Sequence, residues 1–138
     1  VDKPEDPITP LIEAHAGDAV RIHVIGANSE QNGMFGVEGH EWPIEPYMAG
    51  ADMISVVEYA GSEILDVFIR GGAGGPYRQV GDFVWSNARL PYTQSGQWGY
   101  LRVLPTGDAR IQPLSASGAG ARQAEVLPEP QAIPTAMK

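Results

Sequence analysis

GDFVWSNA at residues 81–88 and GQWGYLRV at residues 96–103 are the most informative stretches of this chain. Both contain the β-branched and aromatic residues that favour strands. Residues 89–95 separate them and include a proline, which a central strand does not tolerate. The two stretches therefore predict a strand, a connecting loop and a second strand.

Further strand patterns extend on either side of this pair. Val20, Ile22 and Val24 alternate with small or polar residues, which is the period of a half-buried strand. Residues 54–59 and 64–69 are apolar runs of strand length, with a turn predicted at Gly61 and Ser62. Residues 10–15 and 34–38 complete about seven to eight strands, as expected for a β-sandwich or barrel. The 17 glycines and 12 prolines argue against long helices.

The chain divides into three parts. Residues 1–9 are interpreted as a lead-in segment, residues 10–113 as one domain, and residues 114–138 as an extended or disordered tail rich in small residues and proline. Within the domain, residues 39–52 are expected to form a long loop that presents Trp42. Residues 70–80 contain four glycines and a proline, which predicts a flexible connection.

The composition excludes several classes of function. The formal net charge of −8 disfavours binding to a phosphate backbone, so no nucleic-acid partner is expected. No segment approaches the roughly 18–20 apolar residues of a membrane-spanning helix. The chain has no cysteine, which excludes disulfides, thiolate nucleophiles and thiolate metal sites.

The two opening stretches resemble the last cupredoxin domain of multicopper oxidases. The family pattern begins Gly-Asp-Tyr-x-Tyr and closes on Trp-Gly-x-x-Arg-Val; here residues 81–85 read GDFVW and residues 98–103 read WGYLRV. Residues 16–22, AGDAVRI, are similar to the family's turn into an early strand. The resemblance implies an all-β, cupredoxin-like Greek-key β-sandwich.

A second motif of the family resembles residues 33–40, GMFGVEGH, where the family has His-Pro-x-His-x-His-Gly-His. Across both motifs, other residues stand at the positions to which the resemblance assigns copper ligands. These degenerate positions are Gly33, Gly36, Glu38, Ser86, Asn87, Ala88, Tyr92 and Gln97. A type 1 copper site requires a cysteine sulfur and two imidazoles, so no metal and no cofactor are expected in this domain.

The three histidines of the chain offer little for metal binding. His15 and His23 are expected to flank one hairpin, with His23 on its polar face. His40 matches the last histidine of the second motif, which is not normally a ligand, and is interpreted as a hydrogen-bonded structural residue. A weak site formed by two histidines and Glu38 is a less favoured reading.

The aromatic residues are interpreted mainly as packing groups. Trp85 and Trp98 are expected to point inward from their strands. Trp42 lies beside Pro43 in the expected loop, which makes it the best aromatic candidate for contact with a partner or ligand.

The resemblance leads to one principal hypothesis about function. The chain is interpreted as a copper-free cupredoxin domain or subunit of a multicopper-oxidase-like assembly, with a structural, interface or site-covering role and no catalysis alone. Its partners would be other cupredoxin domains or subunits, in an oligomer or a longer chain, with copper held elsewhere. Because multicopper oxidases are mostly exported, the resemblance implies a periplasmic or extracellular location.

Two alternatives belong to other classes. In the first, Glu38, His40, Trp42 and Tyr92 form the wall of an oxidase substrate site whose copper is held by another domain or chain. In the second, the chain is a stand-alone module that binds a small ligand around Ser86, Asn87 and Tyr92.

Overall fold

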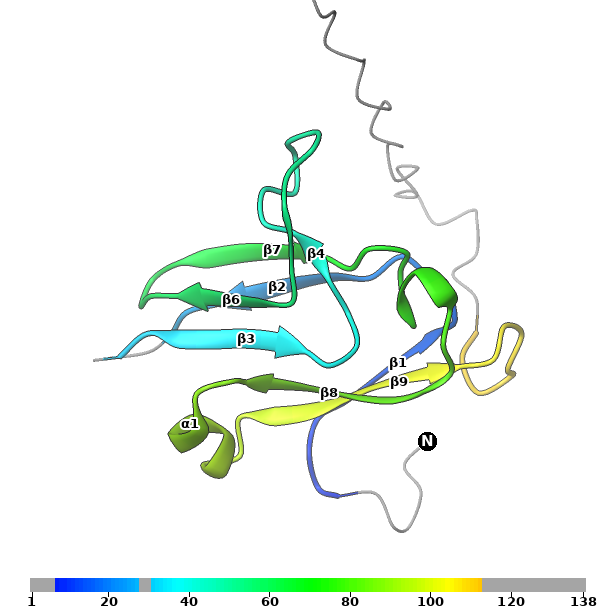
Figure 1. The fold of residues 1–138 in the computed structure, drawn as a ribbon. Helices are drawn as coiled ribbons and strands as arrows, with labels where there is room; N and C mark the ends of the chain where they lie inside the picture. The colour runs from blue at the N-terminus through cyan, green and yellow to red at the C-terminus, as the bar shows by residue number, and fades with distance from the viewer. Residues whose placement is uncertain (1–6, 28–30, 113–138) are drawn as a thin grey trace, which may run out of the picture.

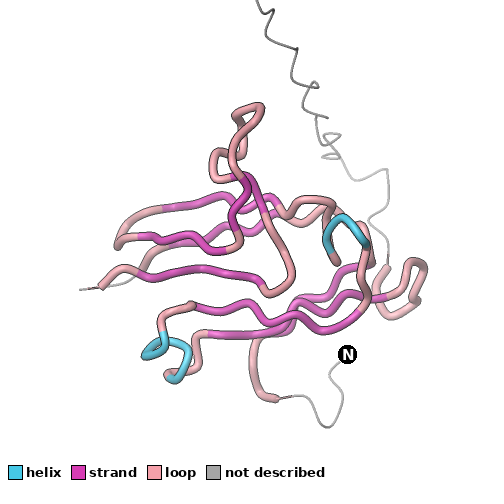
Figure 2. Tube along the Cα trace, viewed as in Figure 1, coloured by secondary structure: helices cyan, strands magenta, loops and turns pink. Residues whose placement is uncertain are grey.

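The computed structural model describes residues 7–27 and 31–112. Its elements are β1 (Leu11–His15), β2 (Arg21–Ile25), β3 (Gly33–Val37), β4 (Trp42–Pro43), β5 (Met53–Ile54), β6 (Val56–Tyr59), β7 (Ile64–Phe68), the 3₁₀ helix η1 (Gly75–Tyr77), β8 (Gly81–Asn87), α1 (Leu90–Gln94) and β9 (Trp98–Leu104). Figure 2 shows how strongly strands dominate this part of the chain. The predicted all-β, cupredoxin-like sandwich is confirmed.

Two sheets of unequal size form the sandwich. The larger has the strand order β1-β9-β8-β3-β6, and the smaller pairs β2 with β7. β1 runs parallel to β9, whereas the other pairings are antiparallel. In Figure 1, β2 and β7 lie on the upper side of the sandwich and β8 and β9 on the lower side. A third, two-stranded pairing joins β4 to β5, and the chain between them projects from the top.

Two connections differ from the hairpins that local sequence suggests. β1 and β2 do not pair, because the chain crosses between the sheets after His15, so His15 and His23 do not flank a hairpin. β6 and β7 also belong to different sheets, although the predicted turn forms, with Ser62 at a φ of 68°. Alternation identifies the buried face of a strand but does not identify its neighbour.

The core lies between the sheets. Its most deeply buried large side chains are Trp42, Leu101, Val37, Val67 and Val103. Trp42 is only 2% exposed, because it lies on β4, which pairs with β5, and packs toward Phe35 with ring centroids 6.1 Å apart. This corrects the expectation that Trp42 is a loop residue available for contact with a partner. Full burial of a large apolar side chain stabilises the fold by about 1.5–3 kcal/mol, so Trp42 is a core residue.

The glycine-rich connection is packed rather than open. Gly72, Ala73, Gly74 and Gly75 are buried, and several of the glycines there adopt the positive φ angles that side chains disfavour. The backbone N–H of Gly74 donates a hydrogen bond of 3.0 Å to Nε2 of His40. Residues 72–75 of the predicted flexible connection are therefore packed, whereas residues 76–80 are exposed.

His40 is a structural residue, as predicted. Its side chain is 3% exposed, and Nδ1 donates to the carbonyl oxygen of Glu38 at 2.7 Å while Nε2 accepts from Gly74. This arrangement requires a neutral imidazole with its proton on Nδ1. The ring therefore joins the turn after β3 to the glycine-rich connection.

The predicted tail, residues 114–138, lies outside the described residues, as does most of the predicted lead-in segment. No helix within residues 7–27 or 31–112 is long and apolar enough to cross a membrane.

Candidate functional site

The residues that the sequence resemblance aligns with copper-ligand positions fall on opposite faces of the large sheet. β8 lies between β3 and β9, with Gly36 opposite Ser86 and Phe35 opposite Asn87. Because side chains alternate along a strand, Asn87 lies on the core side and Ser86 on the outer side. The sheet therefore separates these positions into an inner group and an outer group.

Asn87 is the centre of the inner group. Its side chain is buried, at 5% exposure, and makes four hydrogen bonds. Oδ1 accepts from the backbone N–H groups of Met34 at 3.0 Å and Arg89 at 3.2 Å. Nδ2 donates to the Tyr59 hydroxyl at 3.3 Å and to Oε1 of Gln97 at 3.0 Å. This amide network, defined by Asn87, Tyr59 and Gln97, leaves no lone pair of Asn87 directed at open space.

Tyr59 fills the space beside Gly33, another position of the inner group. The two residues are paired across β3 and β6, and a Cβ atom at Gly33 would lie 2.2 Å from the Tyr59 ring. Even an alanine could not fit there without displacing the aromatic ring. The fold therefore places Tyr59 where a side chain at residue 33 would have to lie.

This close approach makes a prediction about two glycines of one strand. Gly33→Ala is expected to lower the free energy of unfolding by about 1–3 kcal/mol, the usual cost of overpacking a core. Gly36→Ala is the matched control, because its Cβ would lie 3.1 Å from the end of the Val56 side chain and 3.4 Å from the Ser55 carbonyl oxygen, both much longer than the 2.2 Å at Gly33. Urea unfolding of both variants measures the difference, and equal stability of the two would contradict the assigned role of Tyr59.

Gln97 and Tyr92 lie beside the amide network, and Asn87, Tyr59 and Gln97 line part of an apolar pocket that Tyr92 does not reach. The Gln97 N–H donates to the Tyr92 carbonyl oxygen at 3.0 Å, and the Gln97 carbonyl oxygen accepts from the Asn87 N–H at 2.9 Å. Tyr92 lies on α1, where its hydroxyl donates to the Gln31 carbonyl oxygen at 3.4 Å. Arg89 stacks over the Tyr92 ring, with its guanidinium carbon 5.6 Å from the ring centroid. These contacts fasten α1 to the end of β8.

The outer group lies on the opposite face of the large sheet. Glu38 and Ala88 are exposed, Ser86 is half-buried, and Gly36 is covered in part by Val56. The same face carries several apolar side chains that are half-buried or exposed. They are Leu11, Met34, Val56, Val84, Trp98 and Tyr100.

Trp98 belongs to this outer face. It is paired with Ser86 and packs edge-on against Tyr100, with ring centroids 5.8 Å apart. Trp85, by contrast, packs against the core. The expectation that both tryptophans point inward is therefore correct for Trp85 and corrected for Trp98, because register sets their faces.

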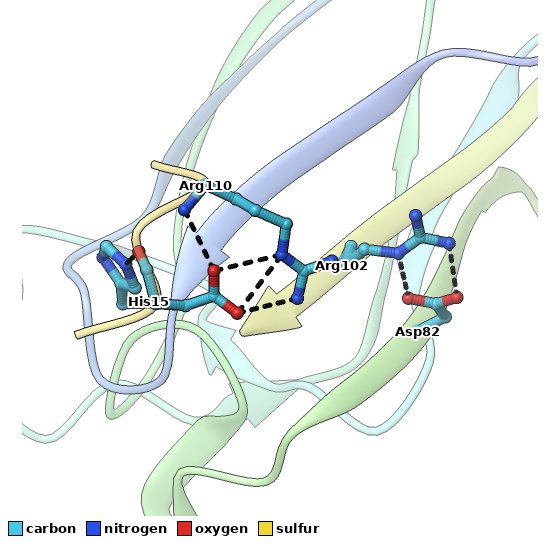
Figure 3. Close-up of polar contacts among 5 residues, drawn as sticks. His15, Asp82, Arg102 and Arg110 are labelled. Atoms are coloured by element: carbon cyan, nitrogen blue, oxygen red, sulfur yellow. Dashed lines mark hydrogen bonds and ion pairs between the residues drawn. The ribbon is translucent and has the colours of Figure 1, made fainter. Parts of the chain in front are cut away.

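An ion pair joins the two opening motifs (Figure 3). Asp82 and Arg102 stand opposite each other on β8 and β9, and the guanidinium donates to both carboxylate oxygens at 2.7 and 2.8 Å. Arg102 is only 3% exposed. A bidentate pair of this geometry sets the register of two strands as well as stabilising them. The Gly-Asp and Arg-Val parts of the motifs thus have a structural function.

A second ion pair lies near the end of β9, in the same close-up. Hydrogen bonds from Arg110 hold the pKa of Asp108 at about 2, and Nε2 of His15 donates to the Asp108 carbonyl oxygen at 2.9 Å. His15 is 7% exposed, so it serves to anchor this turn against the end of β1.

The remaining histidine, His23, lies on the polar face of β2, as predicted. Its Nδ1 is 2.6 Å from Asp66, which also accepts a hydrogen bond from Arg21. That bond from Arg21, with a smaller contribution from His23, lowers the pKa of Asp66. Throughout the described ranges, no three His, Asp or Glu side chains gather closely enough to hold a metal ion together.

The residues proposed for a substrate wall are not brought together. His40 and Trp42 are buried beyond the end of β3, whereas Tyr92 contacts Gln31, before its start. Figure 1 shows α1 and the turn after β3 at opposite ends of the sheet. Glu38 alone of the four is both exposed and on the outer face. Ser86 and Asn87 likewise face opposite sides, so they do not line one ligand pocket with Tyr92.

Comparison with known proteins adds evidence about the fold. No protein-family model and no curated protein matches the sequence. A solved multicopper oxidase is similar with a TM-score of 0.55 and 13% identity, over 75% of this chain and 40% of that one. The multicopper oxidase mgLAC is similar with a TM-score of 0.57 and 17% identity, over 78% of this chain and 35% of that one. The chain thus spans well under half the length of these proteins, and at such identities the likeness shows the cupredoxin-like fold.

Proposed function

We propose that this chain is a copper-free cupredoxin domain or subunit of a multicopper-oxidase-like assembly, where it has a structural, interface or site-covering role. The observation that carries the proposal is the amide network. The family motif that residues 81–88 resemble reads Gly-Asp-Tyr-x-Tyr-His-Cys-His, so the resemblance places Asn87 at its cysteine. All four side-chain hydrogen bonds of Asn87 are made within the protein. Tyr59 covers Gly33, the position of the first imidazole.

The residues present do not fit copper at either group of positions. A type 1 centre needs a thiolate with two imidazoles. The inner group offers Asn87, Gly33, Tyr92 and Gln97 instead. In the outer group, Gly36, Ser86 and Ala88 supply no imidazole, and Glu38 is a lone exposed carboxylate. No redox step is therefore assigned to this domain.

The outer face of the large sheet supports a role in packing against another domain. Its apolar side chains surround Gly36 and Ser86, which present almost no bulk. Exposed apolar surface of this kind marks interaction sites more often than it marks free surface. We propose other cupredoxin domains or subunits as the partners. A periplasmic or extracellular location belongs to the same proposal and rests on the family resemblance.

Copper titration tests the proposal directly. Isothermal titration of the metal-free chain with Cu(II) is expected to show no stoichiometric, tight binding, because the network leaves no converging ligands. Any weak binding should disappear in His23→Ala, since His23 is the exposed imidazole. Copper that remains bound in an equimolar ratio through gel filtration, in wild type and in His23→Ala alike, would overturn the proposal.

A further inference from the structure

One edge of β2 is left unpaired. Ile69 donates to the Val20 carbonyl oxygen at 3.1 Å and Gly26 donates to the Glu63 carbonyl oxygen at 2.8 Å, at the two ends of the β2–β7 pairing. These two bonds set the hydrogen-bonding phase of the antiparallel ladder, so the N–H and C=O groups of the even-numbered residues of β2 point toward β7. The N–H and C=O groups of Arg21 and His23 therefore point to the other side. Within residues 7–27 and 31–112, no strand pairs with that edge.

An apolar pocket of about 300 Å³ lies along the same edge. Its walls come from both sheets and include Ile12, Ile22, Phe35 and Trp85. The pocket exists because a two-stranded sheet covers only part of a five-stranded one. For this reason Ile12, on the core side of β1, remains 41% exposed. The buried Nε1 of Trp85 also has no hydrogen-bond partner in the structure.

We propose that β2 and this pocket bind an extended strand from a neighbouring domain or subunit, which adds to the small sheet. The unpaired N–H and C=O groups recur at every second residue of β2, which is the spacing that another β-strand offers. A strand of a partner can therefore pair with this edge, a mode of binding called β-augmentation. β2 has five residues, so the added strand pairs over about the same length.

The pocket also specifies the side chains of the added strand. Its lining contains no Lys, Arg, Asp or Glu, which favours uncharged apolar side chains at alternate, inward positions. The whole chain carries a net charge of −8, so basic residues flanking the partner strand favour association. The partner is therefore a segment of alternating apolar residues with Lys or Arg beyond its ends.

This inference does not depend on the absence of copper. The edge consists of main-chain groups of β2, which contains none of the candidate ligand positions. The pocket beside it is lined in part by Tyr59, Asn87 and Gln97 of the amide network. Copper binding would overturn the proposed function and leave this inference standing. Failure to bind any peptide would overturn this inference and leave the proposed function standing.

Selection from a displayed library of short random peptides provides the test. Peptides enriched on the wild-type chain are expected to alternate apolar residues and to carry flanking Lys or Arg. His23→Pro removes the edge N–H without removing a bond to β7, and should weaken the selected peptides by about tenfold. His23→Ala is the matched comparison, because it removes the side chain but keeps the N–H, and should bind the selected peptides more tightly than His23→Pro.

A second pair of variants tests the pocket. This pair keeps the proposal testable if His23→Pro does not fold. Ile12→Lys places a charge at the mouth of the pocket, where the side chain is already 41% exposed, and should abolish peptide binding. Ile44→Lys, at an exposed position that lines a different pocket, should leave binding unchanged. Circular dichroism establishes that each variant is folded.

Two results would overturn the proposal. One is a selection in which no peptide is enriched above the starting library. The other is enrichment of peptides whose binding is insensitive to both Ile12→Lys and His23→Pro. Binding of a small apolar dye that Ile12→Lys abolishes, without any peptide enrichment, would instead assign the pocket to a small ligand.

Discussion

Asp82→Ala is expected to lower the free energy of unfolding by about 1.5–3 kcal/mol. The substitution removes the carboxylate that pairs in bidentate geometry with Arg102, a side chain only 3% exposed. Hydrogen bonds that involve a charged group contribute more to stability than neutral ones, and the guanidinium that loses these two is almost fully buried. Urea unfolding followed by tryptophan fluorescence measures the change.

The control for Asp82→Ala is Arg110→Ala, which breaks a more exposed ion pair with Asp108 and should hardly move the urea midpoint. If Asp82→Ala and Arg110→Ala have equal midpoints, the pair between the two motifs does not have the structural role assigned to it.

Asn87→Ala is expected to lower the free energy of unfolding by about 2–4 kcal/mol. It removes the acceptor of the Met34 and Arg89 N–H groups and the donor to Tyr59 and Gln97. Each buried polar group that loses its partner costs about 1–3 kcal/mol, and the groups that water can reach recover part of that cost. Thermal unfolding measured by circular dichroism gives the change in stability.

Ser86→Ala is the neighbouring control for this second prediction. Ser86 lies on the outer side of β8, opposite the amide network, so its removal should change stability by less than about 0.5 kcal/mol. An Asn87→Ala variant as stable as Ser86→Ala would show that the amide network does not hold this end of the sheet together. It would also remove the main support for Asn87 as a structural replacement for a ligand.

These two predictions assign structural roles to residues of the two opening stretches. Asp82 and Arg102 join β8 to β9, and Gly99 allows the Trp85 ring and the Pro10 backbone to approach, since a Cβ there would lie within 2.5 Å of both. The retained parts of the motifs are therefore those that build the sheet. The altered positions, such as Asn87, hold side chains that satisfy their neighbours within the protein.

Much of the fold was predictable because each strand has a recognisable pattern in its own sequence. The alternation of Val20, Ile22 and Val24 and the apolar runs at residues 54–59 and 64–69 gave strands close to their observed bounds. The pairing of those strands was not predictable in the same way. β6 pairs with β3 rather than with β7, because contacts distant in sequence decide the neighbours.

The candidate site shows the same division. Residue types at the motif positions were enough to argue against a thiolate and imidazole copper site, because the chemistry of a side chain is a local property. The environment of those side chains depended on packing. The burial of Trp42, the outward face of Trp98 and the placement of Tyr59 beside Gly33 follow from register and from contacts between strands.

The amino-acid sequence therefore specified an all-β chain, its approximate strands and the absence of cysteine, since composition and period-two patterns are carried by neighbouring residues. The folded chain added the facts that distant residues create together. These are the amide network of Asn87, the bidentate pair of Asp82 and Arg102, and the unpaired edge of β2 beside its apolar pocket. Each depends on which strands become neighbours, and cooperative packing of the whole domain settles that choice.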